Sequence, residues 1–256
     1  MRGFTAFIEK EFRELIRTKR MMILLIVFIA VGILNPATAK LTPKLLEMEA
    51  DSLASMGMTV NEISITALDS WVQFAKNTPI VLIVTLIIFS GIYTSEYTKG
   101  TLIPLLTKGL SRSSVVLSKY VVMFVAWSIG IWLCFGITYF YGDFYWDNSV
   151  VKGVVFAGFC LWLFGVMMVS SIVFFSSIAS SAGQVILGAG GLYFVMMIAG
   201  ISKKVSEYLP TKLLAIGSLY TGELVPSDYK IPAIIAAIIS VNFVIAAFPL
   251  THKRQI

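Results

Sequence analysis

Residues 97–119 read YTKGTLIPLLTKGLSRSSVVLSK, and this stretch separates two long apolar runs of the chain. Its charged residues are all basic, and they are Lys99, Lys108, Arg112 and Lys119. At its centre lies a short apolar patch made of Leu102, Ile103, Leu105 and Leu106. The patch is too brief to cross a bilayer, which takes about 20 apolar residues. The stretch therefore predicts a short amphipathic helix in a loop between two membrane spans.

Local signals predict where this short helix begins and ends. Thr101 can cap a helix that starts at Leu102, and Pro104 then falls in the first turn, where a missing N–H costs no hydrogen bond. Gly109 follows as a C-cap, and Ser111 can cap the next helix. Two interpretations are open from these residues. The helix is either a knob that docks a cytosolic partner or an interfacial helix that only seats its apolar side among lipid headgroups.

Composition places the chain in the membrane. Of its 256 residues 57% are hydrophobic and only 13% are charged, and the mean hydropathy is +0.86. These values exclude an ordinary soluble domain. The short alternating segments of a transmembrane barrel are not seen. The net charge of +6 could suggest nucleic acid, but the basic residues cluster at the ends of apolar runs. We therefore expect no nucleic-acid partner, and we relate the positive charge to membrane orientation.

The predicted fold class is an all-α polytopic membrane protein that forms a single transmembrane domain. The six expected spans are residues 21–37, 78–96, 115–141, 150–178, 183–201 and 231–250. The remaining segments are an N-terminal amphipathic interfacial helix at 4–19, a cytosolic loop at 99–112, and amphipathic outer segments at 40–77 and 202–230. Small residues such as Gly165 and Gly188 are expected to let neighbouring spans pack closely.

Several finer expectations concern the ends of the spans. Pro36 is predicted to mark the outer end of the first span, because the residue before a proline disfavours helix. The outer segment 40–77 is predicted to form two amphipathic helices outside the membrane, with Trp71 at the lipid interface. The segment 202–230 is predicted to form short helices.

Charge asymmetry predicts the orientation. Six spans put both termini and the loop at 99–112 on one side, which then holds more than half of the 20 Lys and Arg residues and few acidic ones. Basic residues near span ends favour the cytoplasmic side, so we expect both termini in the cytoplasm.

The sequence carries no motif for catalysis or nucleotide binding. It has no GxxxxGK[ST] phosphate loop, no HExxH, no GxSxG and no metal-ligating Cys spacing, so we expect no site for ATP hydrolysis, cofactor or metal in this chain. The spans are almost free of charge, and Glu96 is the acidic residue nearest the membrane interior. We predict that Glu96 forms an interfacial ion pair with Arg17 or Arg20, and a dedicated gating role is the alternative.

The whole chain resembles the membrane (permease) subunit of bacterial ATP-binding-cassette transporters of the type-2 exporter superfamily. The resemblance rests on the amphipathic start FTAFIEKEFRELIRTKR, on the segment SEYTKGTLIPLLTKGLSRSSVVLSKY after the second span, on the six spans, and on the outer segment before the last one. The second of these features is the most specific.

The resemblance implies that the short helix after span two is a coupling helix that sits in a groove of a separate ATPase subunit. Its apolar residues would enter the groove, and its basic residues would contact the rim. The residues assigned to this contact are Lys99, Gly100, Thr101, Leu102, Ile103, Pro104, Leu105, Leu106, Thr107, Lys108 and Arg112. ATP and Mg²⁺ would be bound by the partner ATPase, and a second permease subunit, identical or different, would complete the pathway in the bacterial inner membrane.

The function expected from this resemblance is export of a hydrophobic or amphipathic substrate, a peptide or a lipid-like molecule, by a permease half that is not itself an enzyme. The alternative is a non-transporting membrane scaffold or immunity protein that binds a peptide at its outer helices. An intramembrane enzyme is disfavoured because no catalytic constellation can be assembled.

Overall fold

The computed structural model describes residues 2–48, 65–98, 100–107 and 109–253. All regular structure in this part of the chain is helical, which confirms the predicted class. Six helices are long and apolar enough to cross a membrane, so the chain is a multi-pass membrane protein. These helices are α2 (Arg20–Met48), α4 (Ala67–Thr98), α6 (Arg112–Tyr145), α7 (Val154–Ile178), α8 (Ala182–Ala199) and α11 (Lys230–Lys253).

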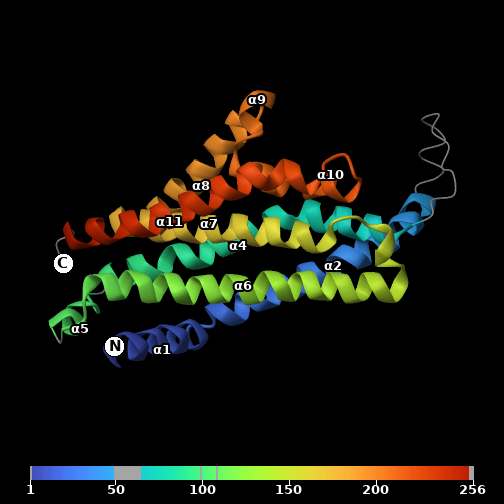
Figure 1. The fold of residues 1–256 in the computed structure, drawn as a ribbon. Helices are drawn as coiled ribbons and strands as arrows, with labels where there is room; N and C mark the ends of the chain where they lie inside the picture. Colours follow the sequence, from blue (N-terminus) through green and yellow to red (C-terminus); the bar gives the residue numbers. More distant parts are fainter. Residues whose placement is uncertain (1, 49–64, 99, 108, 254–256) are drawn as a thin grey trace.

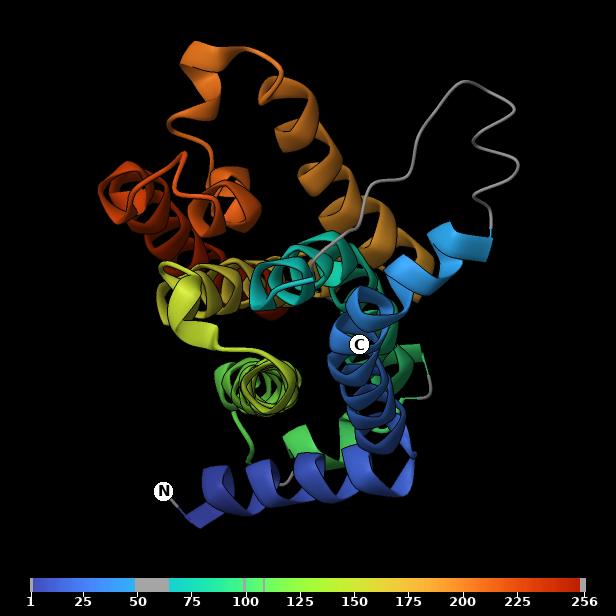
Figure 2. The same ribbon diagram turned by 90° about the vertical axis from the view of Figure 1, so that its right-hand side faces the viewer.

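The long helices run roughly side by side, and α8 leans away from the others (Figures 1 and 2). Helix α7 is the centre of the bundle, because α4, α6, α8 and α11 all pack against it. Most of its residues are buried, whereas only a small share of the residues of α8 and α11 is buried. Such exposure is expected of helices that face lipid or another subunit.

Glycines allow the close packing that the sequence predicted. A methyl group on Gly165 of α7 would lie 1.9 Å from Trp127 Cζ2 of α6, so the indole ring rests directly on the glycine backbone. A methyl group on Gly188 of α8 would lie 2.4 Å from Phe175 Cδ1 of α7. Small residues at these two crossings therefore let large aromatic side chains fill the space between the spans.

Pro36 does not end the first span, which corrects the prediction, because α2 continues through it to Met48. A proline has no N–H, so the carbonyl of Gly32 lacks its usual helical donor. The hydroxyl of Thr138 on α6 lies 3.2 Å from that carbonyl oxygen and shares its proton with Cys134 O at 3.1 Å. A neighbouring span thus helps to satisfy the freed carbonyl, which is how membrane helices tolerate proline.

The same hydroxyl belongs to a chain of hydrogen bonds between three spans. Asn35 Nδ2 of α2 donates to Thr138 Oγ1 at 3.0 Å, and Asn77 Nδ2 of α4 donates to Asn35 Oδ1 at 2.8 Å. Asn35 and Thr138 are fully buried. This network joins α2, α4 and α6, and its buried groups have no water to replace a lost partner.

The outer segment 40–77 differs from its prediction. Its first part prolongs α2 to Met48, and its last part is the beginning of α4, which starts at Ala67; residues 49–64 lie outside the described part. Trp71 is not at a lipid interface, because its side chain is buried and its Nε1 donates to Asn148 Oδ1 at 3.0 Å. Trp71 therefore anchors α4 to the turn that follows α6.

The segment 202–230 forms short helices, as predicted. They are α9 (Lys203–Ser206), the 3₁₀ helix η2 (Pro210–Leu214), α10 (Ile216–Tyr220) and the 3₁₀ helix η3 (Pro226–Tyr229). Another 3₁₀ helix, η1 (Asn148–Val150), connects α6 to α7.

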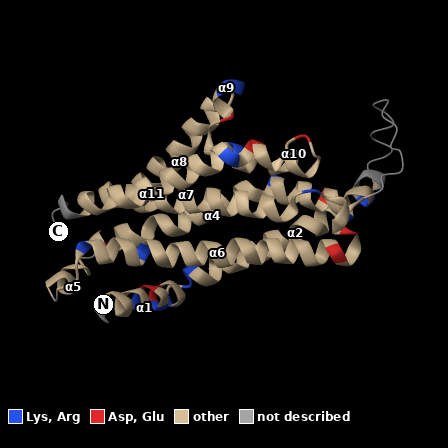
Figure 3. Cartoon of the chain, viewed as in Figure 1, with Lys and Arg blue, Asp and Glu red and all other residues tan. Residues whose placement is uncertain are grey.

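The beginning of the chain forms α1 (Arg2–Arg17), the expected amphipathic helix, and it runs across one end of the bundle (Figure 2). Its apolar side faces protein: Phe7 and Leu15 are buried in the core, and α1 packs against α6 and α2. The end of α11 and the short helix α5 (Ile103–Thr107) lie at the same end of the bundle as α1 (Figure 1). Charged residues gather toward the ends of the helices and leave the middle of the bundle uncharged (Figure 3).

Candidate functional site

Helix α5 is the predicted short helix after the second span, and its boundaries are close to those expected. It begins at Ile103, one residue later than predicted, and Pro104 lies in its first turn. Gly109 follows it with φ +91° and donates its N–H to Leu106 O at 3.0 Å. Ser111 caps α6, since its Oγ accepts from Ser114 N at 3.1 Å. The glycine can adopt this left-handed conformation without strain, which explains the sharp stop.

The apolar patch of this helix is divided between two faces. Leu102 is buried in the core of the chain, and Leu106 packs partly against that core. Ile103 is 47% exposed, and Pro104 and Thr107 are also exposed. Leu102 is therefore an anchor of α5 to its own chain, which differs from the groove-filling role that the sequence suggested. The outward apolar surface of α5 consists of Ile103 and Pro104 among the described side chains.

The basic residues expected at the rim of this surface have different positions. Lys99 and Lys108 lie outside the described residues, as does the side chain of Leu105. Arg112 Nη1 donates to Thr251 O at 2.9 Å, so it ties the start of α6 to the last turn of α11. A cation there also interacts favourably with the negative end of the α11 dipole.

Beside α5 lies a group of five charged residues from three helices, which we call the charge cluster. It consists of Lys10, Glu11 and Glu14 of α1, Glu96 of α4 and Lys119 of α6. Lys119 Nζ lies 2.8 Å from Glu11 Oε2 and 2.5 Å from Glu96 Oε2. Lys10 Nζ lies 2.8 Å from Glu14 Oε2 and 3.0 Å from Glu11 Oε1, and it also pairs with Glu96. The side chains of Glu11, Glu96 and Lys119 are at most 6% exposed.

These contacts correct the predicted partners of Glu96. The sequence predicted an ion pair with Arg17 or Arg20, and Glu96 does form ion pairs, but with Lys10 and Lys119. Arg17 is exposed on the outward polar side of α1, and Arg20 lies beside Gly91 of α4. Neither arginine pairs with Glu96 among the described contacts. The choice of partner follows from α1 crossing the bundle, which brings its third turn, with Lys10, to the end of α4.

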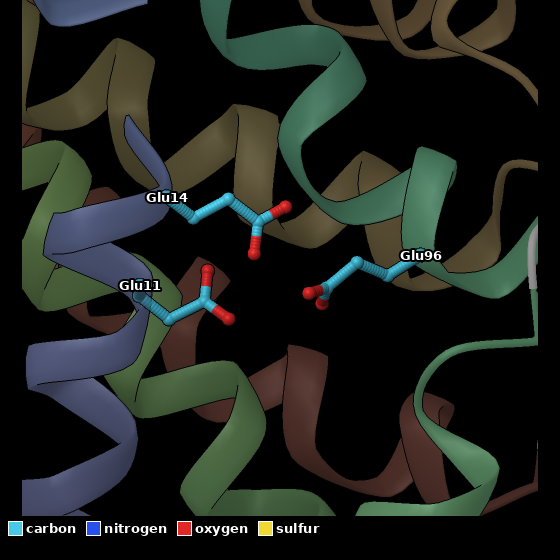
Figure 4. Close-up of side chains that lie close together, drawn as sticks. All are labelled: Glu11, Glu14 and Glu96. Carbon is cyan, nitrogen blue, oxygen red and sulfur yellow. The ribbon is translucent and has the colours of Figure 1, made fainter. Parts of the chain in front are cut away.

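The carboxylates of the cluster point toward one another (Figure 4). Carboxylate oxygens of Glu11, Glu14 and Glu96 lie within 4.8 Å of one another, a spacing that a metal ion could use. The ammonium groups of Lys10 and Lys119 are already within hydrogen-bond distance of these oxygens. Each of the three carboxylates therefore already has a lysine partner, and we assign no metal to the cluster.

The electrostatics of the α1 residues follow from these contacts. Burial alone would lower the pKa of Lys10, but hydrogen bonds to Glu14 and Glu96 outweigh it and hold that pKa above its usual value. Burial would likewise raise the pKa of Glu14, but the hydrogen bond from Lys10 outweighs it and holds the pKa of this carboxyl below 4.5. Both groups are thus charged near neutral pH.

Sequence reasoning missed most of this cluster, although one signal was present. Glu11 stands on the apolar stripe of α1, between Phe7 and Leu15, both of which are buried. A carboxylate on the buried side of an amphipathic helix requires a buried cation or donor. Lys119 could have been proposed as that cation, since it lies two turns into a span.

A separate feature is an apolar cavity of about 220 Å³ between α4, α7 and α8. Its lining includes Leu82 and Leu86 of α4, Met167 and Met168 of α7, and Ala189 and Tyr193 of α8. Its lining comes from the middle of α4 and α7 and the second half of α8. Methionine side chains adapt their shape readily, so this cavity suits an apolar ligand of variable outline.

Comparison with known proteins agrees with this geometry. A family model described as "ABC-2 family transporter protein" matches residues 5–213, from α1 to η2. No curated protein and no solved structure matches the chain.

Proposed function

This chain belongs to the ABC-2 family of transporter proteins as a membrane subunit, and on that premise we propose that it is the permease half of an ATP-driven exporter. A separate ATP-binding-cassette subunit would bind ATP and Mg²⁺ and hydrolyse the nucleotide. The chain would pair with a second permease subunit, identical or different, in a bacterial inner membrane with both termini in the cytoplasm. Basic residues at the end that carries α1 and α5 support this orientation.

The observation that carries the proposal is the position of α5. The helix connects the end of α4 to the beginning of α6, and it lies at the end of the bundle where the chain begins and ends. Ile103 and Pro104 face outward, while Leu102 fixes the helix to the core. A short helix with outward apolar side chains fits a groove on a partner protein, and such anchors contribute most of the binding energy.

Transport would follow from movement of this helix. Closure of two ATPase subunits on ATP would displace α5, and because α5 is continuous with α4 and α6, those spans would tilt with it. The tilt would change the space between α4, α7 and α8, where the apolar cavity lies.

The cavity supports a hydrophobic or amphipathic cargo. It is lined almost wholly by apolar side chains, and none of the residues named in its lining is ionised at neutral pH. A charged solute would lose its hydration there without compensation, whereas an aliphatic chain or an apolar peptide side chain would not. We therefore propose a peptide or a lipid-like molecule as the substrate.

The proposal is tested at Ile103. The tagged chain is purified from its native membrane, and the co-purifying ATPase is identified by mass and reconstituted with it. Ile103→Asp should weaken ATPase binding by about 2 kcal/mol, roughly thirtyfold, as expected for a buried interface anchor. Val205→Asp is the matched control, because Val205 is 43% exposed on α9, away from α5. Equal ATPase binding and equal stimulation of hydrolysis in the wild-type and Ile103→Asp proteins would reject α5 as the docking helix.

A further inference from the structure

The charge cluster includes one residue from each of the two helices that α5 connects. Glu96 belongs to the last turn of α4, and its backbone carbonyl accepts from Thr101 N at 3.1 Å, in the turn that leads into α5. Lys119 belongs to α6, which follows α5 after Gly109 and the capping residue Ser111. The side chains of Glu96 and Lys119 meet at 2.5 Å. The two arms of the loop are therefore joined by an ion pair at its base.

We propose that the charge cluster is the positioning element that makes α1, α4 and α6 move as one body when α5 is displaced. The inference rests on the proposed function, in which α5 docks an ATPase. Glu96 and Lys119 act here as positioning residues, because they reach α5 through the backbone and contact no nucleotide or cargo.

The contacts form a closed triangle between three helices. Lys119 of α6 contacts Glu11 of α1 and Glu96 of α4, and Lys10 of α1 contacts Glu96 of α4. Every pair among α1, α4 and α6 is thus linked by at least one ion pair. Lys119 Nζ also donates to Ile92 O at 3.4 Å, one turn before Glu96, which adds a second contact between α6 and α4.

Burial explains why this triangle resists sliding. Glu11, Glu96 and Lys119 lie in the interior, where the attraction between opposite charges is stronger than in water and an unpaired charge is expensive. Lys10 and Glu14 are partly exposed at its edge. An apolar contact between helices tolerates a shift of an ångström or two, because dispersion forces have no direction. A buried ammonium that separates from its carboxylate loses its partner without gaining water. The three helix ends therefore keep one relative position.

The charges of the cluster provide a matched pair of variants. Three carboxylates surround two ammonium groups, so removal of either Glu96 or Glu14 leaves a balanced cluster and no uncompensated charge. The two carboxylates differ in what they connect. Glu14 is paired with Lys10 of its own helix, four residues away, whereas Glu96 connects α4 to both α1 and α6. Glu96→Ala and Glu14→Ala thus change the net charge equally but break different links.

The experiment compares these variants in the complex reconstituted with its ATPase. We expect Glu96→Ala to insert and to bind the ATPase as the wild-type protein does, while cargo transported per ATP hydrolysed falls about tenfold, the scale expected when a coupled element is disturbed. Glu14→Ala should keep the wild-type ratio. Glu96→Gln can still hydrogen-bond to both lysines, so its ratio of cargo transported to ATP hydrolysed should lie between those of Glu96→Ala and Glu14→Ala.

Three results would overturn the inference. One is an unchanged ratio of transport to hydrolysis in Glu96→Ala. Another is an equal loss in Glu14→Ala, which would mean that net charge matters and the link does not. The third is a loss of ATPase binding in proportion to the loss of transport, which would make the cluster an assembly feature.

A second measurement does not depend on the ATPase. In the isolated chain, Glu96→Ala should speed amide hydrogen exchange in α1 and at residues 100–107, and Glu14→Ala should not. If no ATPase binds even the wild-type protein, the proposed function fails while this arm still decides about the cluster. Equal exchange in the two variants would then reject the positioning role as well.

Discussion

Lys119 Nζ on α6 lies 2.8 Å from Glu11 Oε2 on α1, and both side chains are buried. This contact joins the N-terminal helix to the third span. Because the same ammonium also lies 2.5 Å from Glu96 Oε2, it is the central cation of the charge cluster.

Lys119→Met should therefore be strongly destabilising. The variant would leave Glu11 and Glu96 facing each other with Lys10 as the remaining nearby cation of the cluster. Loss of one partner from a buried ion pair costs about 3–5 kcal/mol of unfolding free energy. Denaturant unfolding of the purified protein in detergent measures this loss. Arg13→Met is the control: Arg13 is 78% exposed and pairs with Glu9 on the surface of α1, so its loss should cost less than about 1 kcal/mol. Equal losses would contradict the buried pairing.

Loss of the hydrogen-bond network of Asn35, Asn77 and Thr138 should lower the stability by a smaller amount. Asn35→Ala removes the residue that accepts from Asn77 and donates to Thr138. Hydrogen bonds between membrane helices contribute about 0.6–1.7 kcal/mol each, so we expect a loss of about 1–2 kcal/mol in the same unfolding assay. Asn242→Ala is the matched control, because Asn242 Nδ2 donates only within its own helix, to Ile238 O at 2.8 Å. A larger loss in the control would argue against the network.

Close packing at Gly165 predicts a steric effect. Gly165→Ala would place a methyl group 1.9 Å from Trp127 Cζ2, and the indole would have to move. Overpacking of this kind costs about 1–3 kcal/mol, visible as a lower unfolding temperature. Gly136→Ala offers the opposite case, since no atom lies within 4 Å of the added methyl group. There the better helix propensity of alanine should raise stability by about 0.5–1 kcal/mol.

The ion pair between Lys10 and Glu14 should make the stability of the protein depend on pH at both extremes. The lowered pKa of Glu14 means that its contribution is present above pH 4.5 and is lost as the pH falls through the folded-state pKa. The raised pKa of Lys10 means that its contribution is fully present below pH 10.5 and is lost as the pH rises further. The free energy of unfolding, measured with denaturant in detergent, should therefore change little between these limits and fall outside them. Glu14→Gln should remove part of the acid limb and also reduce the alkaline limb, because the hydrogen bond to Glu14 is the first cause that raises the pKa of Lys10.

Much of the fold could be predicted because its signals are local. The lengths of the apolar runs correctly predicted six spans, and the periodicity of residues 4–16 predicted the helix that became α1. Gly109 and Ser111 were expected to end one helix and cap the next, and both do so. Each of these signals depends on a few neighbouring residues, so no knowledge of the packing was needed.

The candidate site could be predicted only in part. The position of the short helix α5 after the second span followed from the sequence, but the burial of Leu102 in the core did not. Pro36 was expected to end a helix, and the hydroxyl of Thr138, about a hundred residues away in the chain, helps satisfy the carbonyl that this proline leaves free. Trp71 was expected at the lipid interface, but it is buried and donates to Asn148 Oδ1.

By itself the sequence determined that this protein is a six-span helical membrane protein with a short amphipathic helix after the second span, because hydrophobic length and helical period are properties of contiguous residues. Only the tertiary structure decided that Glu96 would pair with Lys10 and Lys119, away from Arg17 and Arg20. The physical reason is that a buried carboxylate binds whichever cation the packing brings within about 3 Å, and that distance is set by how helices cross, which no local pattern specifies.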